Sequence, residues 1–108
     1  MVETSIAAGS FVLSSLQDTW DGAVRLSGAV HGELASVTDH NLGLVQELIR
    51  RRGMGDAIWV GRWRGHGGSD TRRWAMVWNG RAFQPALLPG TEEHAFLMLK
   101  SQSVEAVA

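Results

Sequence analysis

The chain of 108 residues is long enough for one domain with a modest core and too short for two. Its 10 lysines and arginines nearly balance 11 aspartates and glutamates, so the formal net charge of −1 gives no general attraction to nucleic acid or to an anionic membrane. Cysteine is absent, which excludes disulfides, thiolate nucleophiles and cysteine-based metal sites and favours a reducing compartment.

The sequence predicts no membrane insertion. No apolar run is long enough to span a bilayer. Residues 1–9 also lack the basic region and the long apolar region of a signal peptide.

The first elements in chain order are a strand and a helix. Residues 10–13 (Ser-Phe-Val-Leu) form a short apolar run that predicts a strand, and residues 17–19 then offer helix N-caps. The residues that follow at helical spacing are Trp20, Ala23, Val24 and Ser27. They predict a helix that Gly22 and Gly28 weaken by about 1 kcal/mol each relative to alanine. Residues 32–37 predict an extended link.

Residues 38–52 carry the clearest helical pattern in the chain. Thr38 and Asp39 are N-cap candidates. The apolar positions expected to face the core are Leu44, Val45, Leu48 and Ile49. The arginines at 50–52 suit the negative end of the helix dipole, and Gly53 supplies the stop.

The second half of the chain predicts mostly strands and turns. Residues 56–63 predict a strand with Ile58 and Val60 on one face and Trp59 on the other, followed by a glycine-rich loop at 65–70. The remaining predictions are a strand at 71–78, a turn at Asn79-Gly80, a short returning strand at 81–83, a loop at Pro85 and 88–90, and a buried strand at 93–100. A short helix is the alternative for the last segment.

These elements predict one α+β domain with an ordered core from about residue 10 to about residue 100. Its two helices pack on a small, mostly antiparallel sheet that contains the tryptophan-rich hairpin.

The order of these elements resembles a C-type lectin-like domain over residues 10 to 99. The matching segments are Thr19-Trp20 with Ala23 at the first helix, Gly-Glu-Leu-Ala-Ser-Val at 32–37, the helix at 41–49, Trp-Val-Gly at 59–61, and Trp-Asn-Gly at 78–80 followed by Phe83. The resemblance implies a binding module of that family, which is commonly extracellular. Because the lack of cysteine favours the opposite, the compartment stays open.

The chain departs from the family pattern at its disulfide and calcium positions. Ser27 and Ala95 stand where the family usually has cysteines, and Leu-Pro-Gly-Thr at 88–91 replaces the tripeptide that supplies calcium ligands in sugar-binding members. Glu92 and Glu93 remain as oxygen ligands, whereas calcium takes six to eight oxygens. The resemblance therefore implies a cysteine-free, shortened domain that binds without calcium.

The family's last strand also has no counterpart, so the sequence predicts an open sheet edge. An unpaired edge invites pairing with a second chain. We therefore expect a homodimer through that edge or through the tryptophan hairpin.

Arginines and tryptophans are concentrated in the hairpin region. A period of two places Arg73 on one face with Ala75 and Val77, and Trp74 on the other face with Met76. The candidate ligand-binding residues are Arg62, Arg64, Arg73, Trp74, Trp78 and Asn79. Side chains of these types can stack on bases or sugars and bind carboxylates or phosphates. Burial of the tryptophans, with arginine stems lying over the sheet, explains most of the same pattern.

No segment carries a catalytic or metal-binding motif. His31, His40, His66 and His94 show no zinc-binding spacing. His66 and Asp70 in the glycine-rich loop can be read as a small metal or acid–base site, or as an exposed loop. The loop lacks the Gly-Lys-Ser/Thr ending of a phosphate-binding loop. We therefore expect no cofactor and no enzymatic activity.

The sequence favours a non-catalytic recognition module that binds a protein or a glycan without calcium through the Trp/Arg hairpin. The alternative is a small intracellular, self-associating α+β protein that binds a nucleotide or nucleic acid through its arginines. Salt dependence separates the two, because phosphate contacts weaken steeply with ionic strength. An enzyme that uses His66 or His94 ranks last.

Overall fold

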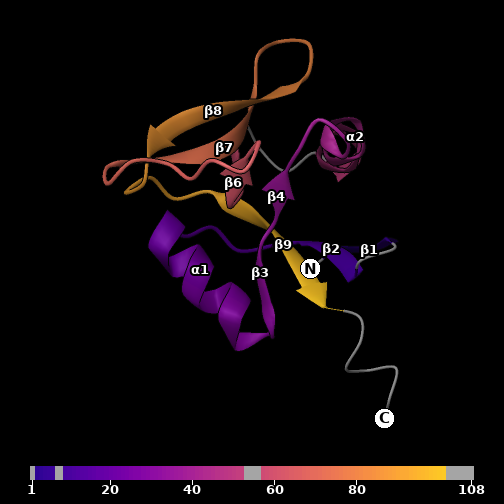
Figure 1. Ribbon diagram of the computed structural model, residues 1–108, viewed down its shortest axis with the longest axis horizontal. Coiled ribbons are helices and arrows are strands. Elements are labelled where there is room, and N and C mark those ends of the chain that lie inside the picture. Colours follow the sequence, from indigo (N-terminus) through magenta and orange to yellow (C-terminus); the bar gives the residue numbers. More distant parts are fainter. Residues whose placement is uncertain (1, 7–8, 53–56, 102–108) are drawn as a thin grey trace.

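A computed structural model describes residues 2–6, 9–52 and 57–101 (Figure 1). In chain order the elements are β1 (Val2–Ile6), β2 (Gly9–Leu13), α1 (Trp20–Ala29), β3 (Gly32–Leu34), β4 (Ser36–Val37), α2 (Leu42–Arg52), β5 (Ala57–Trp59), β6 (Arg62–Trp63), β7 (Arg72–Trp78), β8 (Phe83–Pro89) and β9 (Ala95–Ser101). The α+β class predicted from the sequence is confirmed.

The main sheet is mixed and runs in the order β1-β2-β9-β5-β7-β8, with β3 also paired to β9. The β5–β9 pair is parallel, and every other pair in this sheet is antiparallel. Short parallel strands β4 and β6 form a separate pair. No helix in the described residues is long and apolar enough to cross a membrane.

Strand β9 lies in the middle of the sheet. Its one edge pairs with β2, while its other edge pairs first with β5 and then with β3. Ala95 and Leu97 pack into one core cluster, and Phe96 and Met98 into the other. An uninterrupted apolar run is what a strand buried on both faces requires. The preferred prediction of a strand at 93–100 is therefore confirmed. The sequence also predicted an open sheet edge; the outer strands of the described sheet are β1 and β8.

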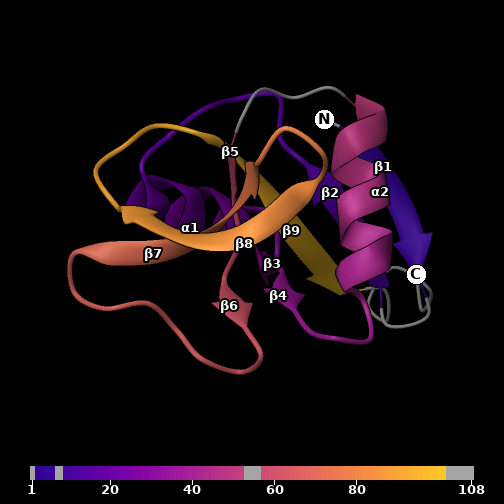
Figure 2. The same cartoon turned by 90° about the horizontal axis from the view of Figure 1, so that it is seen from above.

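The two helices cover opposite faces of the sheet (Figures 1 and 2). Val45 and Ile49 of α2 pack into the cluster that contains Ile58. Ala23 of α1 packs into the second cluster with Trp59. This arrangement explains why Ile58 and Trp59 are both buried although they point to opposite sides of β5.

Helix α2 begins with reciprocal hydrogen bonds between Thr38 and Asn41. The Asn41 side chain accepts from the Thr38 N–H at 2.8 Å, and the Asn41 N–H donates to the Thr38 hydroxyl at 3.3 Å. Leu44 was expected in the core, but its side chain is 43% exposed. Leu42 packs against the core instead, since it shares a helix face with Val45 and Ile49. The predicted stop at Gly53 lies outside the described residues.

The predicted strand at 56–63 breaks into β5 and β6. Gly61 donates its N–H to Ala35 O at 2.8 Å, and a Cβ at this position would lie 2.7 Å from Leu34 O. Only a glycine allows the chain to pass this close to Leu34. Trp59 and Trp63, which a continuous strand would place on one face, therefore pack against different core clusters.

Strand β8 extends from Phe83 to Pro89, where the sequence predicted a short strand and then a loop around Pro85. Pro85 is paired with Met76, and Pro89 with Arg72. Prolines are tolerated here because β8 is an edge strand that pairs on one side only. Strand β1, which was not predicted, pairs with β2.

Two tryptophans fasten the start of α1 to the sheet. The Trp59 indole N–H donates to Asp18 O at 3.0 Å, and the Trp20 indole N–H donates to Val60 O at 3.0 Å. Asp18 and His94 also exchange backbone hydrogen bonds, both at 3.0 Å. The segment before α1 is thus held by both β5 and the segment before β9.

Replacing Trp59 with phenylalanine is expected to destabilise the fold by about 1 to 3 kcal/mol, because the change removes a hydrogen bond and buried volume. Trp78→Phe is the matched control, since Trp78 is 39% exposed and Trp59 is 0% exposed. The control should change stability by less than about 0.5 kcal/mol. Urea unfolding of both variants measures the difference, and equal effects would contradict the role given to Trp59.

Candidate functional site

The side chain of Arg73 on β7 stacks on the indole ring of Trp20 at the start of α1. The guanidinium carbon lies 4.2 Å from the ring centroid. Arg73 reaches the ring because it shares the α1-facing side of β7 with Ala75 and Val77, as the period of two predicts. The contact between cation and ring joins two elements that are 53 positions apart in the sequence.

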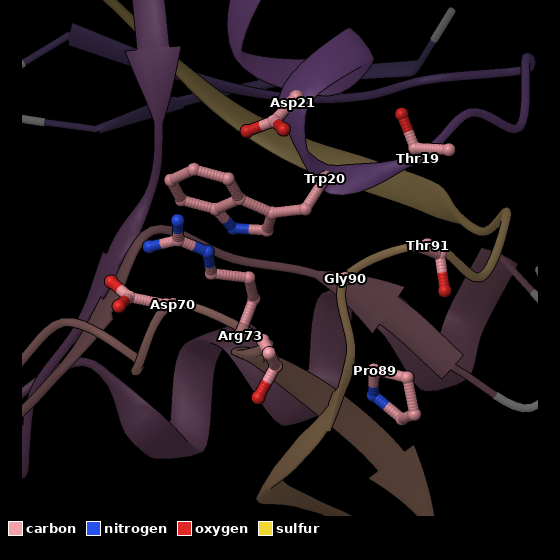
Figure 3. A pocket seen from close by; sticks show the side chains of 9 residues that line it. Thr19, Trp20, Asp21, Asp70, Arg73, Pro89, Gly90 and Thr91 are labelled. Carbon is pink, nitrogen blue, oxygen red and sulfur yellow. The ribbon is translucent and has the colours of Figure 1, made fainter.

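A hollow of about 450 Å³ opens beside this stack (Figure 3). We call it the α1 hollow. Its lining residues are Thr19, Trp20, Asp21, Asp70, Thr71, Arg73, Pro89, Gly90 and Thr91. The hollow therefore combines carboxylate, hydroxyl and guanidinium groups with one aromatic ring. Figure 3 shows Asp70 beside the guanidinium, with Gly90 and Thr91 on the opposite side.

Backbone hydrogen bonds fix the walls of the α1 hollow. The Trp20 N–H donates to Gly90 O at 3.1 Å, and the Gly90 N–H donates to Thr71 O at 3.0 Å. The Thr19 hydroxyl caps α1 by accepting from the Gly22 N–H at 3.2 Å. Most N–H groups at this helix end are therefore already engaged, so the end of α1 is not a free anion site.

A second hollow of about 270 Å³ lies on the other side of the stack. We call it the β6 hollow. Its lining residues are Trp20, Val24, Glu33, Leu34, Ser36, Gly61, Arg62, Gly67, Gly68 and Arg73. Trp20 and Arg73 line both hollows, so the stack forms the wall between them.

Two of the six predicted ligand-binding residues, Arg62 and Arg73, line these hollows. Arg64 does not line them, because it pairs with Asp39 at 3.1 Å and stacks on Trp63 at 4.7 Å from the ring centroid.

The remaining three predicted residues lie elsewhere on the hairpin. Trp74 packs against the α2-side cluster and donates its indole N–H to Gly67 O at 3.3 Å. Trp78 lies at the other end of β7, five residues and about 17 Å from Arg73 at the usual rise of a strand. Asn79 caps the turn by accepting from the N–H groups of Arg81 and Ala82 at 2.9 and 3.0 Å. The six residues therefore do not form one site.

Sequence reasoning missed Trp20 and Asp21 as site residues, and it considered Asp70 only together with His66 as a small metal or acid–base site. Trp20 was assigned only to the first helix, and Asp21 belongs to no motif. The one usable signal was the alternation that places Arg73 on the face opposite Trp74.

The histidines do not build a metal centre within the part of the chain that the structure describes. No group of three or more His, Cys, Asp or Glu side chains is close enough to hold an ion there. His66 exchanges backbone hydrogen bonds with Trp63, both at 3.0 Å. His94 bonds to Glu92 at 2.8 Å and packs edge-on against Trp59 at 5.0 Å between centroids.

The outer edge of β8 is poorly suited to strand pairing. In antiparallel pairs the backbone groups of alternate residues point away from the partner strand. Arg72 bonds its backbone N–H and C=O to Ser69, so the Arg72–Pro89 pair has no hydrogen bonds across it. By alternation Pro85, Leu87 and Pro89 face outward, and the two prolines have no N–H to donate.

Outward carbonyls of this edge are also engaged. Phe83 O accepts from the Gln46 side chain at 2.8 Å, and Pro89 O accepts from the Glu92 N–H at 3.1 Å. Few outward N–H and C=O groups of β8 are therefore free to pair with a second chain. Pairing through β8 is one route to the homodimer expected from the sequence.

No protein-family model and no curated protein matches this chain in the comparisons.

The β8 edge gives a prediction for the oligomeric state. Replacing Pro85 and Pro89 together by threonine supplies two outward N–H groups and should promote self-association at high micromolar concentration. Ala86→Thr is the control, because the N–H of residue 86 faces β7. Size-exclusion chromatography with light scattering should find more self-association for the double variant than for the unchanged chain and the control. Equal self-association of the double variant and the unchanged chain would contradict the role given to the prolines. A stable dimer of the unchanged chain would confirm the homodimer expected from the sequence.

Proposed function

We propose that the chain is a non-catalytic recognition module that binds a protein or a glycan without calcium at the α1 and β6 hollows. The observation that carries this proposal is the Arg73–Trp20 stack, which stands between two hollows lined by polar groups. Small-molecule and recognition sites commonly combine an aromatic surface with a few converging polar groups in a concave surface.

The lining favours binding over catalysis. Neither hollow is lined by a described histidine or lysine, so neither offers the bases most often paired with a hydroxyl nucleophile. Asp21, Asp70 and the three threonines instead supply hydrogen-bond acceptors and donors. Such groups suit the hydroxyls of a glycan as well as the polar groups of a peptide.

The C-type lectin-like resemblance is part of this proposal. Two features support it: β2, near the start of the described chain, pairs with the last strand β9, and the two helices lie between β2 and β5 in the chain. Ser27 and Ala95, at the expected cysteine positions, are both buried, and the Ser27 hydroxyl donates to Ala23 O at 2.8 Å. This hydrogen bond stays within α1, and Ala95 packs into the α2-side cluster, so these two positions do not add support for the resemblance.

Binding of a nucleotide or nucleic acid through the arginines has less support. Arg62 donates to Gly65 O at 3.0 Å, and Arg64 pairs with Asp39. Arg73 shares its hollow with the carboxylates Asp21 and Asp70, which repel phosphate. The arginines therefore do not converge on one anion.

Changing Arg73 to glutamine tests the proposed site, because it removes the cation from both hollows. Glycan and peptide arrays probed with the labelled chain in the presence of a chelator should give hits that Arg73→Gln weakens by about tenfold, the loss expected for one charged contact. Arg51→Gln on the exposed surface of α2 is the control and should keep the hits. Loss of the hits in Trp78→Ala but not in Arg73→Gln would move the site to the hairpin tip. Hits that need calcium would overturn the calcium-independent proposal.

A further inference from the structure

We infer that the two hollows recognise an extended peptide segment that places a basic side chain in the α1 hollow and an acidic side chain in the β6 hollow. This inference rests on the proposed recognition function and names the ligand class. It follows from the opposite charge of two hollows that share one wall.

The α1 hollow carries an excess of negative charge. Asp21 and Asp70 line it against the single cation Arg73. Both carboxylates are exposed, and neither forms an ion pair with another described residue. A lysine or arginine side chain entering this hollow gains two acceptor groups, and the threonine hydroxyls supply further hydrogen bonds.

The β6 hollow carries the opposite excess. Arg62 and Arg73 line it against the single carboxylate Glu33. Arg62 uses one terminal nitrogen to bond Gly65 O, so donors of its guanidinium remain for a ligand. An aspartate or glutamate side chain therefore finds two cations in this hollow.

The stack orients the ligand between the two charges. Because Trp20 and Arg73 line both hollows, a chain that crosses the stack places successive side chains on its two sides. Gly67 also lines the β6 hollow, and no atom lies within 4 Å of the position that a Cβ would take there, which leaves room for a peptide backbone.

This charge pattern selects a peptide over the other ligand classes. A neutral glycan can hydrogen-bond to these side chains but carries no charges that match the opposite signs of the two hollows, and a nucleic acid strand offers no cation for Asp21 and Asp70. An extended peptide projects alternate side chains on the same side about 7 Å apart, so it can supply both charges across the stack.

The test is an NMR titration of the full ¹⁵N-labelled chain with N-acetylated, C-amidated serine-rich hexapeptides. One series carries a lysine and a glutamate separated by one, two or three serines, and the controls carry lysine alone or glutamate alone. The readout is the indole N–H resonance of Trp20. At least one peptide with both charges should bind about fivefold more tightly than either control, the gain expected for one additional exposed ion pair.

Two substitutions separate the contributions of the hollows. Asp70→Asn should reduce the affinity for the best lysine–glutamate peptide toward that for the glutamate-only peptide, with Asp21 retaining part of the difference. Arg62→Gln should reduce it toward that for the lysine-only peptide, with Arg73 retaining part of the difference. Both side chains are exposed, and the remainder of each spectrum reports whether the fold is intact. Equal binding of single-charge and double-charge peptides would overturn the inference.

The neutral oligosaccharides chitotriose and maltotriose distinguish this inference from the proposed function. If either sugar shifts the Trp20 resonance in an Arg73-dependent way and no peptide does, the peptide inference fails and the recognition module stands. If neither the peptides nor the sugars shift the Trp20 resonance and the arrays give no Arg73-dependent hits, both the peptide inference and the proposed recognition function fail.

Discussion

The structure depends on a reciprocal pair of hydrogen bonds made by two tryptophans. Trp59 on β5 donates to the carbonyl before α1, and Trp20 on α1 donates to the carbonyl after β5. Each indole places a large apolar surface in the α1-side core and satisfies a backbone group near its edge. The sheet and the helix are therefore fixed at one point, and the ring of Trp20 is held where Arg73 can cover it.

Burial of the sheet on both faces determines where a ligand can bind. With α2 on one face and α1 on the other, β5 and residues 95–98 of β9 are buried. At the β8 edge, prolines and engaged carbonyls limit backbone pairing. One accessible place is the margin where the start of α1, the start of β7 and the loop after β8 meet, and the Arg73–Trp20 stack lies there.

Local patterns predicted most elements, because a helix or a strand is largely specified by periodicity and its end signals. Where the predictions failed, a distant contact decided the outcome. The break at Gly61 arises from close approach to Leu34, and Pro85 fits in a strand only because β8 is at an edge. The prediction of the site was incomplete for the same reason. Trp20 and Arg73 come together only in the tertiary fold, and no sequence motif connects them.

Hydrogen exchange of the five indole N–H groups tests this account most directly. The account predicts slow exchange for Trp59 and Trp20, whose indoles donate to backbone carbonyls at the junction of α1 and β5. Trp63 and Trp78 should exchange fastest, because their indoles donate to no acceptor among the described residues. Fast exchange at Trp20 would show that its ring is not held in place. That result would contradict the claim that the Arg73–Trp20 stack forms a fixed wall between the α1 and β6 hollows.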